Sequence, residues 1–92
     1  MFAIAFDLDT NDTRQAHPKG LTQAYTDIRF LLERYDFEWR QGSVYVCTNE
    51  DIGNMFDAIL ALKSLPWFPA SVRDIRAFRV EQWSDLTGRM KT

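Results

Sequence analysis

The segment from Phe2 to Leu8 alternates large and small side chains, and this alternation constrains the fold more than any other feature of the chain. Every second position is large and apolar, whereas the positions between them are Ala3, Ala5 and Asp7. A period of two residues predicts a β-strand, because successive side chains of a strand point to opposite faces of a sheet. Both faces are apolar in the first half of the segment, so we expect a strand that is covered from both sides.

Two later segments have the spacing of amphipathic helices. Leu21 to Tyr35 carries apolar side chains every three or four residues, and a second such stripe begins at Ile52 and ends near Ser64. The residues before the second stripe, Thr48 to Asp51, are of the kind that cap a helix N-terminus. Residues 9–20 are polar and include proline and glycine, so we expect a loop there.

Three further strands are predicted. Phe37 to Arg40 and Ser43 to Cys47 are short strand-like segments, and Gln41-Gly42 between them suits a tight hairpin turn. Pro69 is expected to prevent the following segment from starting as a helix, and the extended pattern of Val72 to Val80 predicts the last strand. The final ten residues are polar and only weakly helical.

The elements follow the order strand, helix, strand, strand, helix, strand, which is that of the ferredoxin-like fold. We therefore predict an α+β protein with a four-stranded antiparallel sheet, both helices on one face, and a short C-terminal extension. A chain of 92 residues is long enough for one hydrophobic core, so residues 1–92 are expected to form a single domain.

This arrangement leaves one face of the sheet without a helix. Because the first strand is apolar on both sides, we expect two copies of the chain to bury these faces against each other as a two-fold homodimer. A hydrophobic content of 46% agrees with apolar surface beyond what one subunit can cover. The alternative is that the C-terminal segment around Trp83 and Leu86 folds over the sheet.

Composition limits the kinds of partner. With a formal net charge of −2 and a pI near 5.2, the chain lacks the basic excess that drives sequence-independent phosphate binding, so any nucleic-acid site must be local. The single cysteine, Cys47, lies in an apolar run and is expected to be a buried thiol in a reducing compartment. The sequence has no signal-peptide pattern and no apolar stretch of membrane length, which predicts a cytoplasmic protein without a membrane partner.

Two acids mark the end of the first strand, in the sequence Phe6-Asp7-Leu8-Asp9-Thr10. An apolar strand that ends in acids is also found in haloacid-dehalogenase phosphatases, where an aspartate is the nucleophile. Thr10 comes one residue too early for that motif, and 92 residues are too few for the Rossmann-like domain of those enzymes. Taken alone, Asp7 is explained as a solvated strand end or a helix cap.

A resemblance over nearly the whole chain changes this interpretation. Three motifs occur in the order found in the virulence-associated protein D (VapD) family, namely Ala3 to Leu8, Phe37 to Val46, and Trp67-Phe68 followed by Ser71 to Phe78. That family is similar in fold to the small CRISPR-associated Cas endoribonucleases. The resemblance implies a ferredoxin-like homodimer that cleaves RNA as the toxin of a toxin–antitoxin pair, with a small antitoxin protein as partner. It also implies that Asp7 of each subunit lies near the dimer axis.

Asp7 is therefore the first candidate catalytic residue, followed by Asp9 and Ser43. Two Asp7 carboxylates that meet at a symmetry axis could hold a divalent metal such as magnesium, which activates water. They could instead raise the pKa of one carboxyl, which would then act as a base on the ribose 2′-hydroxyl. Both mechanisms stay open at this point, and Asp7 is the one candidate metal ligand. Ser43 follows Gly42, where the backbone can approach a phosphate closely.

Candidate RNA contacts are Arg40, Arg76 and Tyr45. A guanidinium group matches a phosphate in bidentate fashion, and the hydroxyls of Ser43 and Tyr45 should share one face of the sheet. The alternative for the arginines, which include Arg73 and Arg79 as weaker candidates, is ordinary ion pairing with nearby carboxylates. The alternative for the hydroxyls is hydrogen bonding with their neighbours.

Large aromatic side chains are a further possible RNA contact, because unpaired bases stack on aromatic rings. For these residues we favour packing in the core or in a dimer interface: Trp39, Trp67, Phe68 and Trp83. His17, beside Pro18 in a polar segment, is expected to take no part in catalysis.

The sequence thus predicts an endoribonuclease, with two alternatives. One is a non-catalytic ferredoxin-like module that dimerises or binds nucleic acid or a ligand, since fold alone does not decide function. The other is a structural protein that binds duplex DNA without cutting it, against which the acidic pI speaks.

Overall fold

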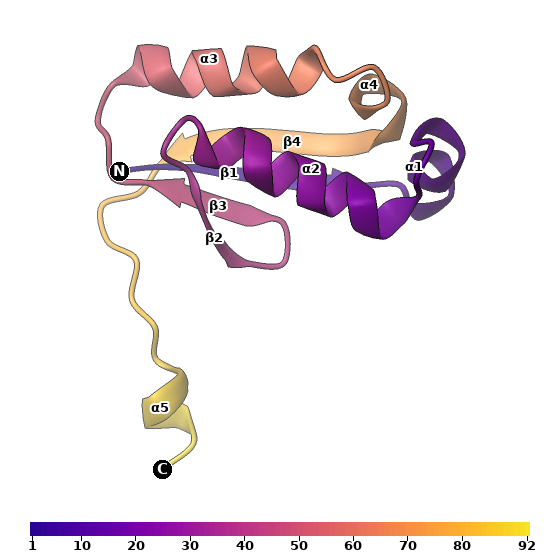
Figure 1. Ribbon diagram of the computed structural model, residues 1–92. Helices are drawn as coiled ribbons and strands as arrows, with labels where there is room; N and C mark the ends of the chain where they lie inside the picture. Colours follow the sequence, from indigo (N-terminus) through magenta and orange to yellow (C-terminus); the bar gives the residue numbers. More distant parts are fainter.

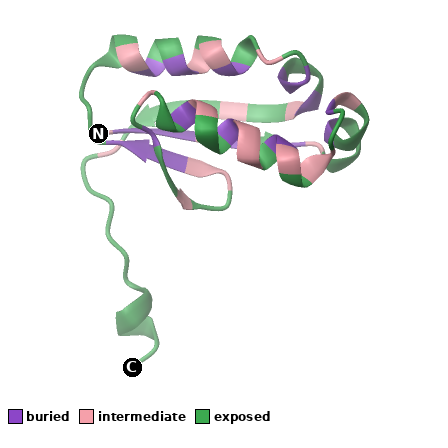
Figure 2. Ribbon diagram, in the orientation of Figure 1, coloured by how far each residue is buried: buried purple, intermediate pink, exposed green.

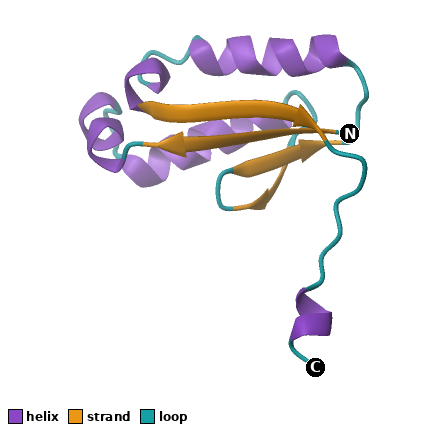
Figure 3. Ribbon diagram, turned by 180° about the vertical axis from the view of Figure 1, so that it is seen from behind, coloured by secondary structure: helices purple, strands orange, loops and turns teal.

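Two helices cover one face of a four-stranded sheet, and the other face carries no helix (Figure 1; Figure 3). The computed structural model describes all 92 residues. The elements in chain order are β1 (Phe2–Leu8), α1 (Thr10–Ala16), α2 (Leu21–Glu33), β2 (Glu38–Gln41), β3 (Val44–Cys47), α3 (Ile52–Lys63), α4 (Phe68–Ser71), β4 (Val72–Arg79) and α5 (Thr87–Met90). None of the helices is long and apolar enough to cross a membrane.

The strand order is β2-β3-β1-β4, and every neighbouring pair is antiparallel. This is the ferredoxin-like arrangement, so the predicted α+β fold is confirmed. β1 lies in the interior of the sheet, where Ala5 pairs with Val44 of β3 on one side and with Arg76 of β4 on the other. The hairpin between β2 and β3 turns at Gly42, which has a positive φ of 47° that other residues rarely adopt.

The alternation of β1 determines how the core is built. Its four large side chains, from Phe2 to Leu8, belong to a single hydrophobic cluster on the face that the helices cover. α2 contributes one buried stripe and α3 another, with residues spaced three or four apart as an amphipathic helix requires. Figure 2 shows buried segments on the sides of the helices and strands that face one another. Cys47 lies in the same cluster as a buried thiol, as predicted, and burial raises its pKa.

The structure corrects the predicted loop over residues 9–20. Thr10–Ala16 is a helix, whose N-cap is Asp9: the Asp9 side chain accepts a hydrogen bond from the Asp12 amide at 2.9 Å. The Thr13 hydroxyl donates to the Asp9 carbonyl at 2.6 Å, and Thr13 is the one buried residue of the helix. A helix of seven residues with a single buried threonine has no apolar stripe, so the periodicity of the sequence could not indicate it.

A second correction concerns Pro69, which was expected to prevent a helix start. Phe68–Ser71 forms one helical turn with the proline in its first turn, where a missing amide hydrogen costs no hydrogen bond. The turn is tied to the end of β1, because the Asp9 amide donates to the Ser71 carbonyl at 2.8 Å. The strand that follows begins at Val72, as predicted.

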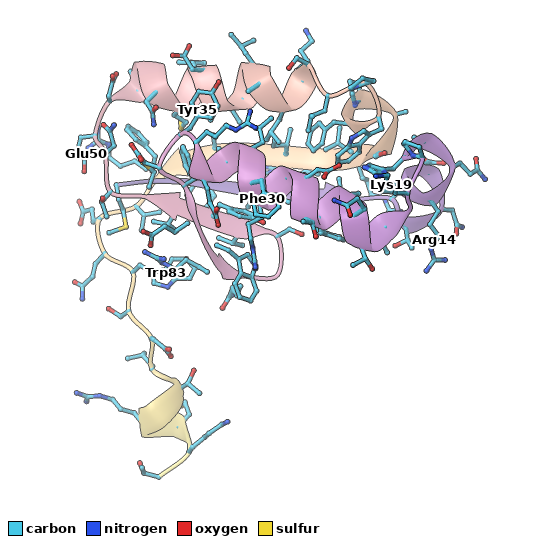
Figure 4. All side chains as sticks on the ribbon, viewed as in Figure 1. Arg14, Lys19, Phe30, Tyr35, Glu50 and Trp83 are labelled. Atoms are coloured by element: carbon cyan, nitrogen blue, oxygen red, sulfur yellow. The ribbon has the colours of Figure 1, made fainter.

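The C-terminal segment does not fold over the sheet. After β4 it runs away from the body of the molecule and ends in the short helix α5 (Figure 1; Figure 3). Leu86 and Met90 are exposed, and Trp83 lies on this segment near the β2 side of the sheet (Figure 4). The radius of gyration of 14.1 Å exceeds the ~12 Å expected for a compact chain of this length, in agreement with a projecting end. Leu86 and the residues after it therefore leave the open face uncovered, whereas Trp83 lines a hollow with Arg40, and Ala3 and Val46 on that face are already buried within one subunit.

We expect the core to be tested cleanly by two leucines of α3. Leu62 is 0% exposed, whereas Leu60 on the outer face of the same helix is 60% exposed. Leu62→Ala should lower the free energy of unfolding by about 2–5 kcal/mol because it leaves a cavity. Leu60→Ala should change it by less than about 0.5 kcal/mol. Urea denaturation at one fixed protein concentration measures both, and equal losses would contradict the assigned core.

Candidate active site

Asp7 lies at the end of β1 on the open face of the sheet. Strand alternation places it on the same side as Ala3 and Ala5, and its side chain is exposed. Its partner across the antiparallel pair is Asp74 of β4, and the register shifts directly after Asp7. An irregularity at this point ends regular pairing and redirects the chain, as β-bulges do near functional sites.

Arg73 of β4 joins the two acids at the end of β1. One guanidinium nitrogen, Nη2, lies 2.7 Å from Oδ2 of Asp9, and the other, Nη1, lies 3.7 Å from Oδ2 of Asp7. The Asp12 amide and then the Arg73 guanidinium hold the pKa of Asp9 below its ordinary value. Asp9 is thus ionised and occupied by two partners, whereas Asp7 has one distant cation and an open side.

A second ion pair lies beside the first along β4. The Arg76 guanidinium bonds to both carboxylate oxygens of Asp74, at 3.1 and 3.3 Å. Arg76 is opposite Ala5 in the sheet register, so its side chain shares the open face with Asp7. The end of the open face thereby combines carboxylates with two guanidinium groups, which is the charge pattern that could receive a phosphodiester beside a proton acceptor.

The structure brings together only part of the predicted site. Ser43 and Tyr45 do share a face, as predicted, but it is the helix-covered face: Tyr45 pairs with Ile4, is 2% exposed and stacks on Phe6. Arg40 is on β2 and pairs with Glu38 at 3.0 Å. Asp7, Asp9 and Arg76 therefore lie near one end of the open face. Ser43 and Tyr45 lie on the opposite, helix-covered face of the sheet.

Sequence reasoning gave too little weight to Arg73 and Asp74. Arg73 was only a weaker candidate for phosphate contact and Asp74 only an ion-pair partner, yet they are the residues of β4 nearest to Asp7. The signal that could have found them is register, because antiparallel pairing of β1 with β4 must place some pair opposite Asp7. The sequence does not state that register.

His17 lies in the short loop between α1 and α2, as the C-cap of α1, and its contacts are structural. It is buried; the Lys19 amide donates to its Nδ1 at 2.9 Å, so the Nε2 hydrogen points to Asp27 at 2.7 Å. Its ring packs edge-on against Trp67, with 4.9 Å between the centroids. The core packing predicted for Trp67 and Phe68 is confirmed, whereas Trp39 and Trp83 lie outside the core.

The carboxylates of Asp7 and Asp9 are the candidate ligands for a metal ion at the end of β1. No group of three or more histidine, cysteine, aspartate or glutamate side chains is placed to hold a metal ion. The Arg73 cation lies between Asp7 and Asp9, in the position that a metal shared by those two carboxylates would require. A magnesium site at Asp7 would consequently need oxygen ligands from outside this subunit.

Fold and site define a ferredoxin-like protein with an acidic strand end on an open sheet face, and comparisons with known proteins make this more specific. The family model of the CRISPR associated protein Cas2 matches residues 1–87. Endoribonuclease VapD homolog of Neisseria gonorrhoeae is 60% identical over 92 residues, which is the full length of both chains. Endoribonuclease VapD of Haemophilus influenzae is 58% identical over 87 residues, covering 95% of this chain and 94% of the relative.

A third relative, Endoribonuclease VapD of Helicobacter pylori, is 43% identical over 94 residues and is matched along the full length of both chains. The chain therefore belongs to the Cas2 family and, within it, to the group of VapD proteins. The resemblance that the three sequence motifs indicated is confirmed.

The lowered pKa of Asp9 predicts a pH dependence of stability. Because the folded-state pKa lies below the ordinary value of 3.8, ionised Asp9 favours folding above that value, and the contribution is lost as the pH falls through the folded-state pKa. Asp9→Asn keeps an acceptor for the Asp12 amide but loses the ion pair with Arg73. We expect it to lower the melting temperature at neutral pH, with a difference from wild type that shrinks below about pH 4. Thermal unfolding at several pH values measures this, and a difference independent of pH would contradict it.

Proposed function

We propose that the chain is an endoribonuclease that cleaves RNA phosphodiester bonds, with Asp7 as its catalytic carboxylate. The observation that carries the proposal is the position of Asp7: an exposed acid at the end of a buried interior strand, with Arg73 at 3.7 Å and Arg76 on the same face. The names of the VapD relatives support the same reaction. A rigid strand holds a reacting group more firmly than a loop can.

The active form in this proposal is a homodimer that joins two open faces. The centre of that face is apolar and small, with Ala3, Ala5 and Val46 around β1 and β3, and Phe78 exposed on β4. Alanine side chains let a second sheet approach closely, and a two-fold axis near β1 would bring the two Asp7 carboxylates toward each other. Ala3 and Val46 are already buried within one subunit, and the accessible part of the face for a second copy is at Ala5 and Phe78.

Two roles for the Asp7 pair are compatible with this geometry. One carboxylate would take the proton of a ribose 2′-hydroxyl, whose oxygen would attack phosphorus and displace the 5′-oxygen, and the same proton would pass to that leaving oxygen to give a 5′-hydroxyl and a cyclic phosphate. Alternatively the two carboxylates would hold a divalent cation. In both cases Arg73 and Arg76 would face the anionic phosphate and favour its added charge.

In the cell, we propose a cytoplasmic toxin that is held in check by a small antitoxin protein. The support is the motif resemblance together with the acidic, locally charged surface, which suits a nuclease whose access to RNA is confined to one place. The open face and the acidic strand end are the parts of the surface that an inhibitor would need to cover.

The Asp7 role predicts a loss of cleavage. Asp7→Ala should lower the rate on a defined single-stranded RNA by about 10²–10⁴-fold, because a positioned proton acceptor contributes that much. Asp57→Ala, at an exposed acid of α3, is the matched control and should cleave normally. Running both with magnesium and with EDTA, and identifying the product ends, separates the two chemical roles.

The same two variants test the toxin role, since induced wild type and Asp57→Ala should slow growth and Asp7→Ala should not. Full cleavage by folded Asp7→Ala would overturn the active site. RNA that is bound but stays intact with wild type would favour a binding module instead.

The dimer predicts a second result. Ala5→Lys places a positive charge opposite Arg76 on the open face and should convert a dimer of twice 10.8 kDa into a monomer with little cleavage activity, because burial in the dimer would hold two like charges together. Leu60→Lys, on the outer face of α3, should leave the mass unchanged. Sedimentation equilibrium measures both; a wild-type monomer at all concentrations would remove the dimer from the proposal.

A further inference from the structure

A pocket outside the Asp7 site lies between α2 and the β2–β3 hairpin. Its volume of about 430 Å³ is within the range of small-molecule sites, which is roughly 300–1,000 Å³. Aromatic side chains and one cation dominate its lining: Tyr25, Arg29 and Phe30 from α2, and Trp39 and Tyr45 from the hairpin. Figure 4 shows Phe30 on α2, and its side chain is exposed.

Trp39 is held in place although it lies at the edge of the molecule. It is 46% exposed on β2, and its indole Nε1 donates to the Gly42 carbonyl at 2.9 Å. The Arg29 guanidinium carbon lies 4.6 Å from the centroid of the ring, in a cation–π contact. The two side chains thus form a fixed flat platform, which lowers the entropy cost of stacking a further planar group on it.

The charge of the pocket differs from that of the strands. The arginines of β2 and β4 each have a carboxylate partner: Arg40, Arg73, Arg76 and Arg79. In contrast, no carboxylate oxygen lies within 4.0 Å of the Arg29 guanidinium. No acidic residue lines the pocket. Burial raises the pKa of Tyr45 at the pocket wall, and the neighbouring Arg29 acts in the opposite direction. Arg29 is therefore the one charged side chain that lines this pocket, whereas the adjoining hollow on the other side of Arg29 and Trp39 is lined by acids: Glu33, Asp36 and Glu38.

We propose that this pocket binds an unpaired base of single-stranded RNA, stacked on the Arg29–Trp39 platform, with the adjoining phosphate facing Arg29. Aromatic rings and guanidinium planes are the groups on which unpaired bases stack, and Arg29, which has no carboxylate partner, is the one charge that an adjoining phosphate would meet inside the pocket. The proposal depends on the proposed function only in taking RNA as the ligand.

The pocket is on the helix side of β2, and β1 with Asp7 is two strands away on the other face. At a strand spacing of about 4.8 Å, an RNA strand that passes round the β2 edge would span roughly 10 Å of sheet between the two sites. The pocket is then a subsite for a nucleotide next to the cleaved bond or a few residues from it, and it selects single strands because a paired base cannot enter.

The experiment measures binding rather than cleavage. Fluorescence anisotropy of a labelled 12-nucleotide single strand, and of the same sequence as a blunt duplex, is recorded with Asp7→Asn protein so that the RNA stays intact. Adding Trp39→Ala should weaken single-strand binding about 5- to 150-fold, the equivalent of ~1–3 kcal/mol for one stacked base, and leave duplex binding unchanged. Trp39→Phe should retain most of the affinity. Phe56→Ala removes a 57% exposed ring from α3 and is the matched control.

Each outcome decides one point. Equal binding by folded Trp39→Ala and Phe56→Ala overturns the pocket, and so does an equal loss for single strand and duplex. Unchanged RNA binding together with altered self-association on sedimentation would assign Trp39 to a protein contact and also overturn it. A wild-type protein that leaves RNA intact but binds it through Trp39 would overturn the nuclease and leave this pocket standing.

Discussion

The packing of β1 under the two helices is the constraint on which the rest of the structure depends. Its four large side chains fill the core between the sheet and the helices, and a strand that turns one set of side chains inward must turn the other set outward. That second set is Ala3, Ala5 and Asp7, so the open face is small and apolar up to the point where it becomes acidic. Burial of one face by the hydrophobic effect thereby determines the chemistry of the other.

The end of β1 is chemically distinct because three backbone features meet there. The register with β4 shifts after Asp7, the next helix begins at Asp9, and the Asp9 amide is tied to the Ser71 carbonyl. The Asp9 carboxylate has two partners in this arrangement, since it caps α1 and binds Arg73. Of two acids that look equivalent in the sequence, the fold leaves only Asp7 with an open side. That asymmetry is the physical reason to rank Asp7 first.

How much the sequence could predict follows from what each pattern measures. Periodicity reports burial, so the four strands and the two long helices, with their apolar stripes, were predicted with the right order. α1 was missed because a polar helix with one buried threonine carries no such signal. The alternation of side chains along a strand showed that Ser43 and Tyr45 share a face. Which face that is depends on the pairing of Val44 with Ala5, and this pairing cannot be read from one strand alone. For the same reason the sequence did not show that Arg73 and Asp74 lie beside Asp7.

Charge pairing explains how an acidic chain could handle RNA without a basic surface. The strand arginines are largely neutralised by neighbouring carboxylates, so they add little long-range attraction, and what remains is short-range and directional. Arg29 is different because its partner is the indole of Trp39, which shields one side of the guanidinium without cancelling its charge. An anionic ligand would therefore gain most of its binding free energy from contacts with a few individual side chains. At the Arg29–Trp39 platform, a planar base adds stacking energy that a phosphate alone does not supply. Affinity of this kind depends on the conformation of the RNA more than on its charge density, which distinguishes a strand with exposed bases from a duplex.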